Sequence, residues 1–210
     1  MTDWSDESQL VERLRRGDDE AFSEVIDRLG RPMIDFASVF VGDDDLAEEL
    51  AQETWMAVID GIDDFEGRSS LKTWVFAILS NRARRRANRD KRMRPWSSIF
   101  DESIESALSK HAERFDQNGR WAQPPGQWSI DPEENLMKRD LLEVIRDTLG
   151  ELPESQRAVV RLRDVEGLSA AQTCDVLDIS DGNQRVLLHR GRVKLRDAVE
   201  QYFESTETSS

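Results

Sequence analysis

The sequence predicts an all-α fold in which two helical domains are joined by a long linker. Only 6 prolines and 11 glycines occur among the 210 residues, and the chain is poor in β-branched runs. Apolar residues recur with a helical period up to residue 94 and again from residue 131. Between these stretches, residues 95–134 contain four of the prolines and three of the six tryptophans, a composition typical of a linker rather than a core.

Residues 1–94 form the predicted first domain. Leu10, Val11 and Leu14 indicate one helix, and a second apolar stripe follows at Phe22, Val25, Ile26 and Leu29. A further stripe begins after Pro32, at Met33, Ala37 and Phe40. We therefore expect a run of amphipathic helices.

The next predicted helix begins at GDDD, residues 42–45, which provides an N-cap and an acidic first turn. One face is apolar and should be buried: Ala47, Leu50, Ala51, Thr54, Val58 and Ile62. The other face is polar or exposed, with Asp45, Glu48, Glu49, Gln52 and Met56.

A loop over residues 63–70 precedes the last helix of this domain, and Ser69 or Ser70 can cap that helix. Its apolar stripe consists of Leu71, Trp74, Val75 and Ile78. On the same face the stripe continues as Arg82, Arg85 and Arg89. The helix is thus predicted to be anchored at its start and cationic at its end.

Within the linker, a short amphipathic helix over residues 101–115 is expected from Ile104, Leu108, His111 and Phe115. Such a helix fits either a partner protein or one of the two domains. The second domain is predicted over residues 135–203, with a helix ended by Gly150, a second over residues 152–167, and a third with a capping box at Ser169 and Gln172. The tail, residues 204–210, is expected to be disordered.

Residues 168–196 have the proportions of a helix-turn-helix, with a turn around Ser180 and Gly182. We expect Leu188, Gly191 and Leu195 to face the first helix of the motif, because a glycine inside a helix costs about 1 kcal/mol and is explained by a close backbone approach. The residues then left to face DNA are Asn183, Arg185, Val186, His189 and Arg190. The alternative is an ordinary basic helix with solvated charges.

Charge is distributed unevenly along a chain whose formal net charge is −14. Residues 1–66 hold 5 basic and 20 acidic side chains, whereas residues 67–95 hold 10 and 1. A second basic segment lies at residues 180–196. An acidic protein binds a polyanion poorly on its own, so this division predicts two contacts with nucleic acid and a partner that covers the acidic surface.

Composition excludes several classes of function. No stretch reaches the roughly 20 apolar residues of a membrane span, and the acidic N-terminus is unlike a signal peptide, so we expect a cytoplasmic protein without membrane insertion. Cys174 is the single cysteine and His111 and His189 are the two histidines, so neither an internal disulfide nor a zinc site is expected, and Cys174 is interpreted as structural. No catalytic constellation, metal site or cofactor site is predicted.

The sequence resembles the extracytoplasmic-function (ECF, group 4) sigma factors, the promoter-recognition subunits of bacterial RNA polymerase. The resemblance is carried, in family order, by GDDEAF (17–22), DLAEELAQETW (45–55), FEGRSSLKTWVFAILSNRARRR (65–86), DPE (131–133), LPESQRAVVRLRDVEGLS (152–169) and ISDGNQRVLLHRGRVKLR (179–196). It implies sigma region 2 at residues 1–94 and sigma region 4 at residues 135–203. Compared with the family pattern, the linker is long, and Gln184, Val186 and Leu187 depart from it.

The resemblance also assigns residues to partners. A surface for the β′ clamp helices of core polymerase would be formed by Asp45, Glu48, Glu49, Gln52, Glu53, Trp55 and Met56. Recognition and opening of the minus 10 element would fall to Phe65, Gly67, Arg68, Ser69, Ser70, Lys72, Thr73, Trp74, Asn81, Arg82, Arg85, Arg86 and Arg89. For Trp74, stacking on a base and packing in the core are both open.

Region 4 would contact the β flap of polymerase and read the minus 35 element through Ser180, Gly182, Asn183, Arg185, Val186, His189, Arg190 and Arg192. The family further implies an anti-sigma factor as a partner. The expected function is therefore binding of core polymerase and promoter-specific initiation, without catalysis by this chain. The alternatives are a helix-turn-helix regulator that binds DNA without polymerase, and an interaction protein that does not read DNA.

Overall fold

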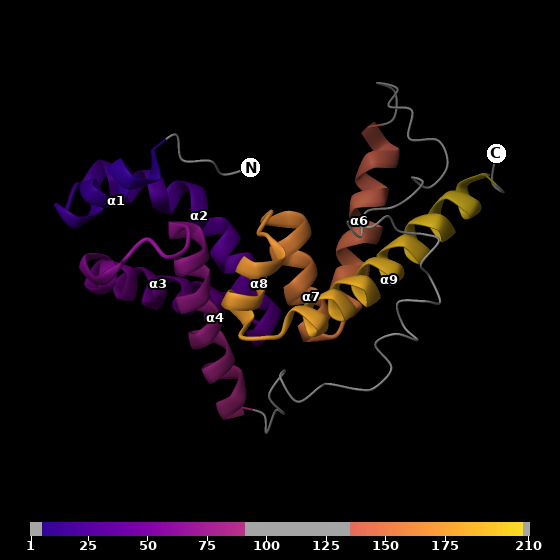
Figure 1. The fold of residues 1–210 in the computed structure, drawn as a ribbon. Coiled ribbons are helices and arrows are strands. Elements are labelled where there is room, and N and C mark those ends of the chain that lie inside the picture. Colours follow the sequence, from indigo (N-terminus) through magenta and orange to yellow (C-terminus); the bar gives the residue numbers. More distant parts are fainter. Residues whose placement is uncertain (1–5, 91–134, 208–210) are drawn as a thin grey trace. The chain divides into compact units, whose positions relative to one another are not determined.

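The computed structural model describes residues 6–90 and 135–207, and every described element is helical (Figure 1). The linker and the helix expected over residues 101–115 lie outside these ranges. The chain divides into two compact units. Within the described residues, the first unit contains residues 6–90 and Arg161–Asp181, and the second contains residues 135–160 and 182–207.

Helices α1 (Glu7–Arg15), α2 (Asp19–Val41) and α3 (Asp44–Gly61) begin where the sequence provides caps. The carboxylates of Asp6, Asp18 and Asp43 accept backbone N–H groups of the first turns that follow them. Gly42 ends α2 with φ of 63°, a left-handed conformation that favours glycine. The predicted buried face of α3 is confirmed, since Ala47, Leu50, Ala51, Thr54 and Val58 are all buried.

Pro32 does not divide α2, although the sequence suggested separate stripes before and after it. The helix continues through the proline, and Val25, Leu29, Met33 and Phe36 form one buried stripe that spans it. A proline inside a helix costs about 3 kcal/mol, because it removes a hydrogen bond and crowds the preceding turn. Burial of four large side chains, at about 1.5–3 kcal/mol each, more than offsets this cost.

Helix α4 (Leu71–Asp90) packs against α2 and α3. Ser70 caps it as predicted, because its Oγ accepts the N–H of Thr73 at 3.1 Å. The carboxylate of Glu7 on α1 accepts the N–H of Leu71 at 2.9 Å, so two of the free donors at the start of α4 are satisfied. Leu71, Val75, Phe76, Leu79 and Ala83 are buried.

The first unit also contains η5 (Arg161–Val165), a turn of π-helix, and α8 (Ala170–Leu177). The predicted capping box is present, with Ser169 and Gln172 exchanging hydrogen bonds with each other's backbone. Helix α8 packs against α4 (Figure 1). The expected second domain, residues 135–203, is therefore divided between the two units.

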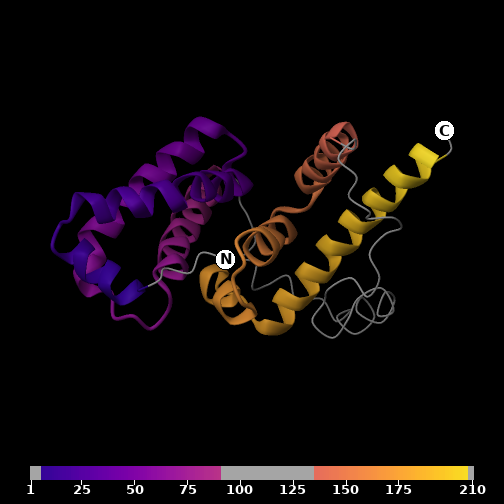
Figure 2. The same cartoon turned by 90° about the horizontal axis from the view of Figure 1, so that it is seen from above.

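The second unit contains α6 (Asn135–Glu151), α7 (Glu154–Val160) and, from Gly182 on, α9 (Asp181–Glu207). A β-carbon at Gly191 would lie 2.5 Å from Cγ2 of Val160, so this glycine does allow a close approach, but to α7 and not, as predicted, to the first helix of the motif. Helix α9 is uninterrupted (Figure 2) and ends at Glu207, four residues beyond the expected end of the second domain at residue 203. The hydroxyls of Ser205 and Thr206 bond the carbonyl of Tyr202 and support its last turn.

In the part of the chain that the structure describes, no helix is both long enough and apolar enough to cross a membrane.

Candidate nucleic-acid and polymerase interface

The exposed face of α3 carries acidic and apolar side chains together. Asp45, Glu48, Glu49, Gln52 and Met56 are exposed, and Glu53 and Trp55 are half-buried. Met56 is 67% exposed, more than any other large apolar side chain in the described residues. These seven are the residues that the sequence assigned to a polymerase contact.

Ile59 extends this face and was not predicted. It is 53% exposed and lies three positions after Met56 and four after Trp55, one turn further along the same side of the helix. The spacing was visible in the sequence. The motif shared with the family, however, ends at Trp55, and the predicted face extended only as far as Met56.

The loop before α4 has a buried and an exposed part. Phe65 is buried and its ring lies 5.0 Å from that of Trp74, so Trp74 packs against the protein rather than standing free to stack. Gly67 has φ of 69°, and Arg68 is exposed and pairs with Glu66 at 3.0 Å. Ser69 is half-buried. Arg68 is thus the one cation in this loop, at its tip.

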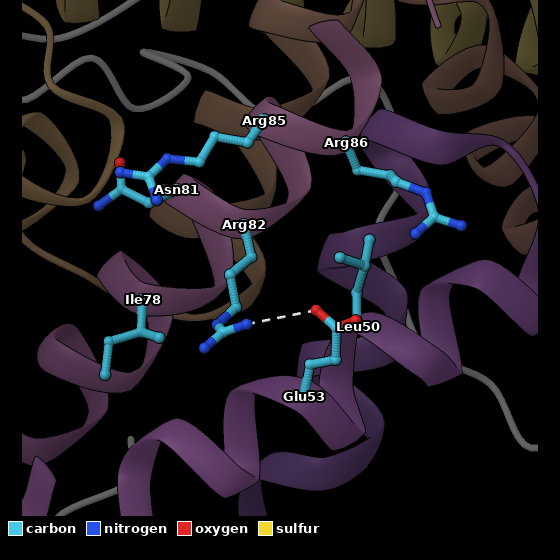
Figure 3. A pocket seen from close by; sticks show the side chains of 7 residues that line it. All are labelled: Leu50, Glu53, Ile78, Asn81, Arg82, Arg85 and Arg86. Atoms are coloured by element: carbon cyan, nitrogen blue, oxygen red, sulfur yellow. Dashed lines mark hydrogen bonds and ion pairs between the residues drawn. The ribbon is translucent and has the colours of Figure 1, made fainter. Parts of the chain in front are cut away.

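The C-terminal part of α4 faces α3 across a cavity of about 420 Å³ (Figure 3). Its lining residues are Leu50, Glu53, Ile78, Asn81, Arg82, Arg85 and Arg86. Arg82 points toward α3, and its Nη1 lies 3.3 Å from Oε2 of Glu53. Arg86 pairs with Glu49 at 3.6 Å, whereas Asn81 and Arg85 are exposed. The predicted DNA-contacting arginines therefore share one groove with Glu53, a residue of the predicted polymerase contact.

The N-terminal part of α4 differs, because its predicted DNA contacts are covered. Thr73 is 2% exposed, and its hydroxyl lies 2.8 Å from that of Ser70. Lys72 is 9% exposed, and its ammonium lies 2.9 Å from Oε2 of Glu166. Ser70 is half-buried and lies 3.5 Å from Nε2 of Gln172. Arg89 belongs to α4, but its side chain is outside the described part of the structure.

In α9 and the turn before it, exposure also divides the predicted residues. Ser180 and Arg185 are exposed, and Gly182, His189, Arg190 and Arg192 are half-buried. Asn183 and Val186 are only 4% and 5% exposed, so the prediction that they face DNA is not met in this structure. The reason is that the buried side of α9 is wider than predicted: Leu188 is buried as expected, but Gln184 and Leu187 are buried as well.

Groups with shifted pKa values lie outside these surfaces. A hydrogen bond from Arg13 Nε at 2.7 Å, together with the N–H groups of Ala21 and Glu20, holds the pKa of Asp18 below its usual value. Burial, reinforced by Asp181 and Asp175, raises the pKa of the Cys174 thiol, which favours its protonated form. Over residues 6–90 and 135–207, no cluster of three His, Cys, Asp or Glu side chains could hold a metal ion.

Comparisons with known proteins match both parts of the chain. Residues 25–93 match the family described as Sigma-70 region 2, and residues 142–195 match Sigma-70, region 4. The ECF RNA polymerase sigma-E factor of Haemophilus influenzae is 24% identical over 201 residues, covering 95% of this chain and 98% of that protein. The RNA polymerase sigma-H factor of Pseudomonas aeruginosa is 28% identical over 195 residues, covering 92% and 94%.

Two solved structures share the fold. One is CnrH in complex with the cytosolic domain of CnrY, with 19% identity and a TM-score of 0.56 over 93% of this chain and 97% of that one. The other is the sigma factor RpoE in complex with the anti-sigma factor NepR from Bartonella quintana, with 21% identity and a TM-score of 0.55 over 85% and 96%. Because both sigma-70 regions match in order and the relatives align over nearly their whole length, this chain belongs to the ECF sigma factors.

Proposed function

We propose that this chain binds core RNA polymerase through the exposed face of α3 and directs initiation at promoters through α4 and α9. One observation carries the proposal: an acidic, partly apolar face and an arginine face lie side by side on α3 and α4. Because the two adjacent faces carry opposite charge, they suit two different partners that are bound at the same time. The acidic face suits a basic protein surface, and the arginine face suits nucleic acid.

The contact with polymerase would centre on Met56 and Ile59. Large apolar side chains in the middle of an interface supply most of its binding energy, and surrounding charges set orientation and association rate. Around these two residues, Glu48, Glu49 and Gln52 provide such a polar surround. We expect a basic, helical partner surface, as the β′ clamp helices are in this family.

The contact with the minus 10 element would use the loop tip at Arg68 and the groove lined by Asn81, Arg82 and Arg85. Opening a duplex costs a few kcal/mol per unstacked base, and cationic side chains along the single strand repay part of this cost. At the minus 35 element, Arg185 would make the main contact with the bases, because it is exposed near the start of α9, where a recognition helix meets base edges.

The acidity of the chain supports a requirement for polymerase. With a net charge of −14, the free protein repels DNA at long range, and binding of a basic partner removes part of that repulsion. By analogy with the RpoE–NepR complex, we also propose an anti-sigma protein as a partner of this chain. The proposed site of action is the cytoplasm, where polymerase and the chromosome are found.

Run-off transcription with purified core polymerase, on the DNA upstream of the gene for this protein, tests the proposal. We expect a promoter-dependent transcript only when both the protein and core enzyme are present. Met56→Asp should reduce the affinity for core polymerase at least about tenfold, because it places a carboxylate in the centre of the interface. Ile26→Asp is a matched control, since Ile26 is an apolar side chain 43% exposed on α2 and is not part of the α3 face.

Absence of any transcript with core enzyme, combined with a shift of the same promoter DNA by the protein alone, would instead support a regulator that works without polymerase. Equal loss of core binding in Met56→Asp and Ile26→Asp would remove α3 as the specific contact.

A further inference from the structure

A segment from the C-terminal part of the sequence, Arg161–Asp181, covers one side of α4. The segment includes α8, the first helix of the predicted helix-turn-helix, and it belongs to the same compact unit as α1–α4. It meets the N-terminal part of that unit through Lys72 with Glu166, Arg161 with Asp35, Arg84 with Leu177, and Gln172 with Ser70. These pairs join residues 93 to 126 positions apart in the chain.

The segment meets α4 and α2 through a network of alternating charge, which is buried at Lys72 and Glu166 and half-buried at Arg161 and Asp35. The ammonium of Lys72 donates to the backbone oxygen of Glu166 at 2.7 Å and lies 2.9 Å from its carboxylate. The side chains of Lys72 and Glu166 are 11% and 5% exposed. The guanidinium of Arg161 lies 3.7 Å from the same carboxylate and donates to Asp35 at 2.6 Å. Buried charges are tolerated only when they are paired, so this network specifies how the segment docks.

The end of α8 is held separately. Arg84 donates from Nη1 to the carbonyl of Leu177, the last residue of α8, at 2.8 Å. Helix C-terminal carbonyls carry partial negative charge and have no partner within the helix, so an arginine satisfies both needs. The covering segment is therefore fixed near both ends of α8 as well as at Glu166.

In this arrangement, parts of both predicted DNA-binding elements are engaged in contacts within the protein. Lys72 and Ser70 belong to the minus 10 contact that was predicted from the sequence, and here their polar groups are directed to Glu166 and Gln172. Helix α8 is the support for the recognition helix, and here it packs on α4. Neither Lys72 nor α8 can meet promoter DNA in this arrangement.

We propose that Arg161–Asp181 is an internal cover that keeps the free protein from binding promoter DNA, and that it leaves α4 when polymerase and promoter are engaged. The inference rests on the proposed function, and it requires no second protein. The exchange is chemically balanced, because a DNA phosphate replaces the Glu166 carboxylate as the anionic partner of Lys72. Opening also breaks hydrogen bonds of Arg84 and Gln172, and water can satisfy the groups that it releases.

A crosslink that locks the cover tests whether opening is required. Cysteines are placed by Asp35→Cys and Arg161→Cys in a Cys174→Ser background and are joined with a short bismaleimide. Neither position belongs to the proposed DNA or polymerase contacts. The control carries Arg13→Cys and Asp18→Cys, which replace an ion pair at 2.7 Å between α1 and the start of α2. The readout is run-off transcription with core polymerase, before and after crosslinking.

We expect the Asp35–Arg161 crosslink to reduce promoter-dependent transcript at least about tenfold and the control crosslink to leave it unchanged. Full activity of the locked protein would overturn the proposal. If the protein gives no transcript even before crosslinking, the proposed function fails. The presence of the cover is then judged by the measurement that follows.

Acetylation of lysines, followed by mass spectrometry, tests the cover without polymerase or DNA. In the free full-length protein, Lys72 should react at least about tenfold more slowly than Lys194, which is exposed on α9. Glu166→Gln should remove most of this protection while circular dichroism stays unchanged. Equal reactivity of Lys72 and Lys194 in the unmodified protein would show that the cover is absent in solution and would overturn the proposal.

Discussion

The two sides of α4 hold ion pairs of the same kind in opposite environments. Toward α3, Arg82 and Arg86 pair with Glu53 and Glu49, and these four side chains are between 35% and 52% exposed. Toward α8, Lys72 pairs with Glu166 at 11% and 5% exposure. Exposed pairs contribute little and exchange readily, whereas a buried pair fixes a geometry and is costly to break singly. On one side of α4, therefore, the cations Arg82 and Arg86 form exposed ion pairs that a new partner can replace. On the other side, Lys72 is held in a buried ion pair.

The largest expected effect is on hydrogen exchange of α8, on the side of α4 that holds the buried Lys72–Glu166 pair. Glu166→Gln leaves the Lys72 ammonium buried without its carboxylate, a loss of about 3 kcal/mol, so hydrogen exchange of the α8 amides should accelerate about a hundredfold. Glu53→Gln should change exchange of the α3 and α4 amides less than about fivefold, since an exposed pair contributes at most about 1 kcal/mol. Replacing both partners, as Lys72→Met with Glu166→Leu, should restore most of the protection of α8. Equal effects of the two single substitutions would remove the contrast between the two sides.

A smaller effect is expected on promoter binding by the protein in complex with core polymerase. Arg85→Ala removes an exposed cation of the groove, and it should lower the slope of log affinity against log salt by about 0.7, as for one phosphate contact to a single strand. Arg84→Ala is the matched control, because Arg84 is not among the residues that line the groove and its guanidinium is directed to the side of α4 that faces α8. Equal changes in slope would mean that both arginines contact DNA in the open complex.

A still smaller effect is expected from releasing one arginine in the absence of polymerase. Glu53→Gln releases Arg82, and binding of the free protein to a labelled single-stranded oligonucleotide should strengthen a few-fold at low salt. Glu48→Gln removes the same charge from the same helix, and Glu48 takes part in none of the described ion pairs. Similar gains in both variants would assign the effect to net charge alone.

The smallest effect is expected at an ion pair on neither side of α4. Because the pKa of Asp18 is held below its usual value, its ionised form stabilises the fold above the unfolded pKa of about 3.9, and this contribution is lost as pH falls through the lower folded value. Asp18→Asn keeps a capping oxygen but loses the charge that pairs with Arg13. Urea unfolding should therefore find this variant less stable at pH 7, with a difference that shrinks below about pH 4.

Local signals in the sequence predicted most of the helices. The caps at Asp43, Ser70 and Ser169 and the buried face of α3 were all apparent from spacing and residue type. These features depend on neighbours within one turn, which the sequence displays directly. Pro32 was the local signal that misled, because burial over the whole length of α2 outweighs one lost hydrogen bond.

The division of α4 into two sides was beyond the reach of local signals. Lys72 and Arg82 both appeared as cations of one DNA-binding helix, and nothing near Lys72 in the sequence indicates Glu166, 94 residues away. Likewise, Val186 was assigned to the DNA side because periodicity does not reveal how wide the buried side of α9 is. Long-range pairing decides which charges of a basic segment remain open to a partner, and that pairing is a property of the fold.

The length of α9 has a consequence for the reach of the protein. Its 27 residues extend for about 40 Å, whereas a major groove is only about 12 Å wide. If its N-terminal turns enter the groove, the turns that carry Tyr202 and Phe203 extend well past the edge of the duplex. In that geometry, the C-terminal end of α9 can contact a neighbouring polypeptide rather than the double helix.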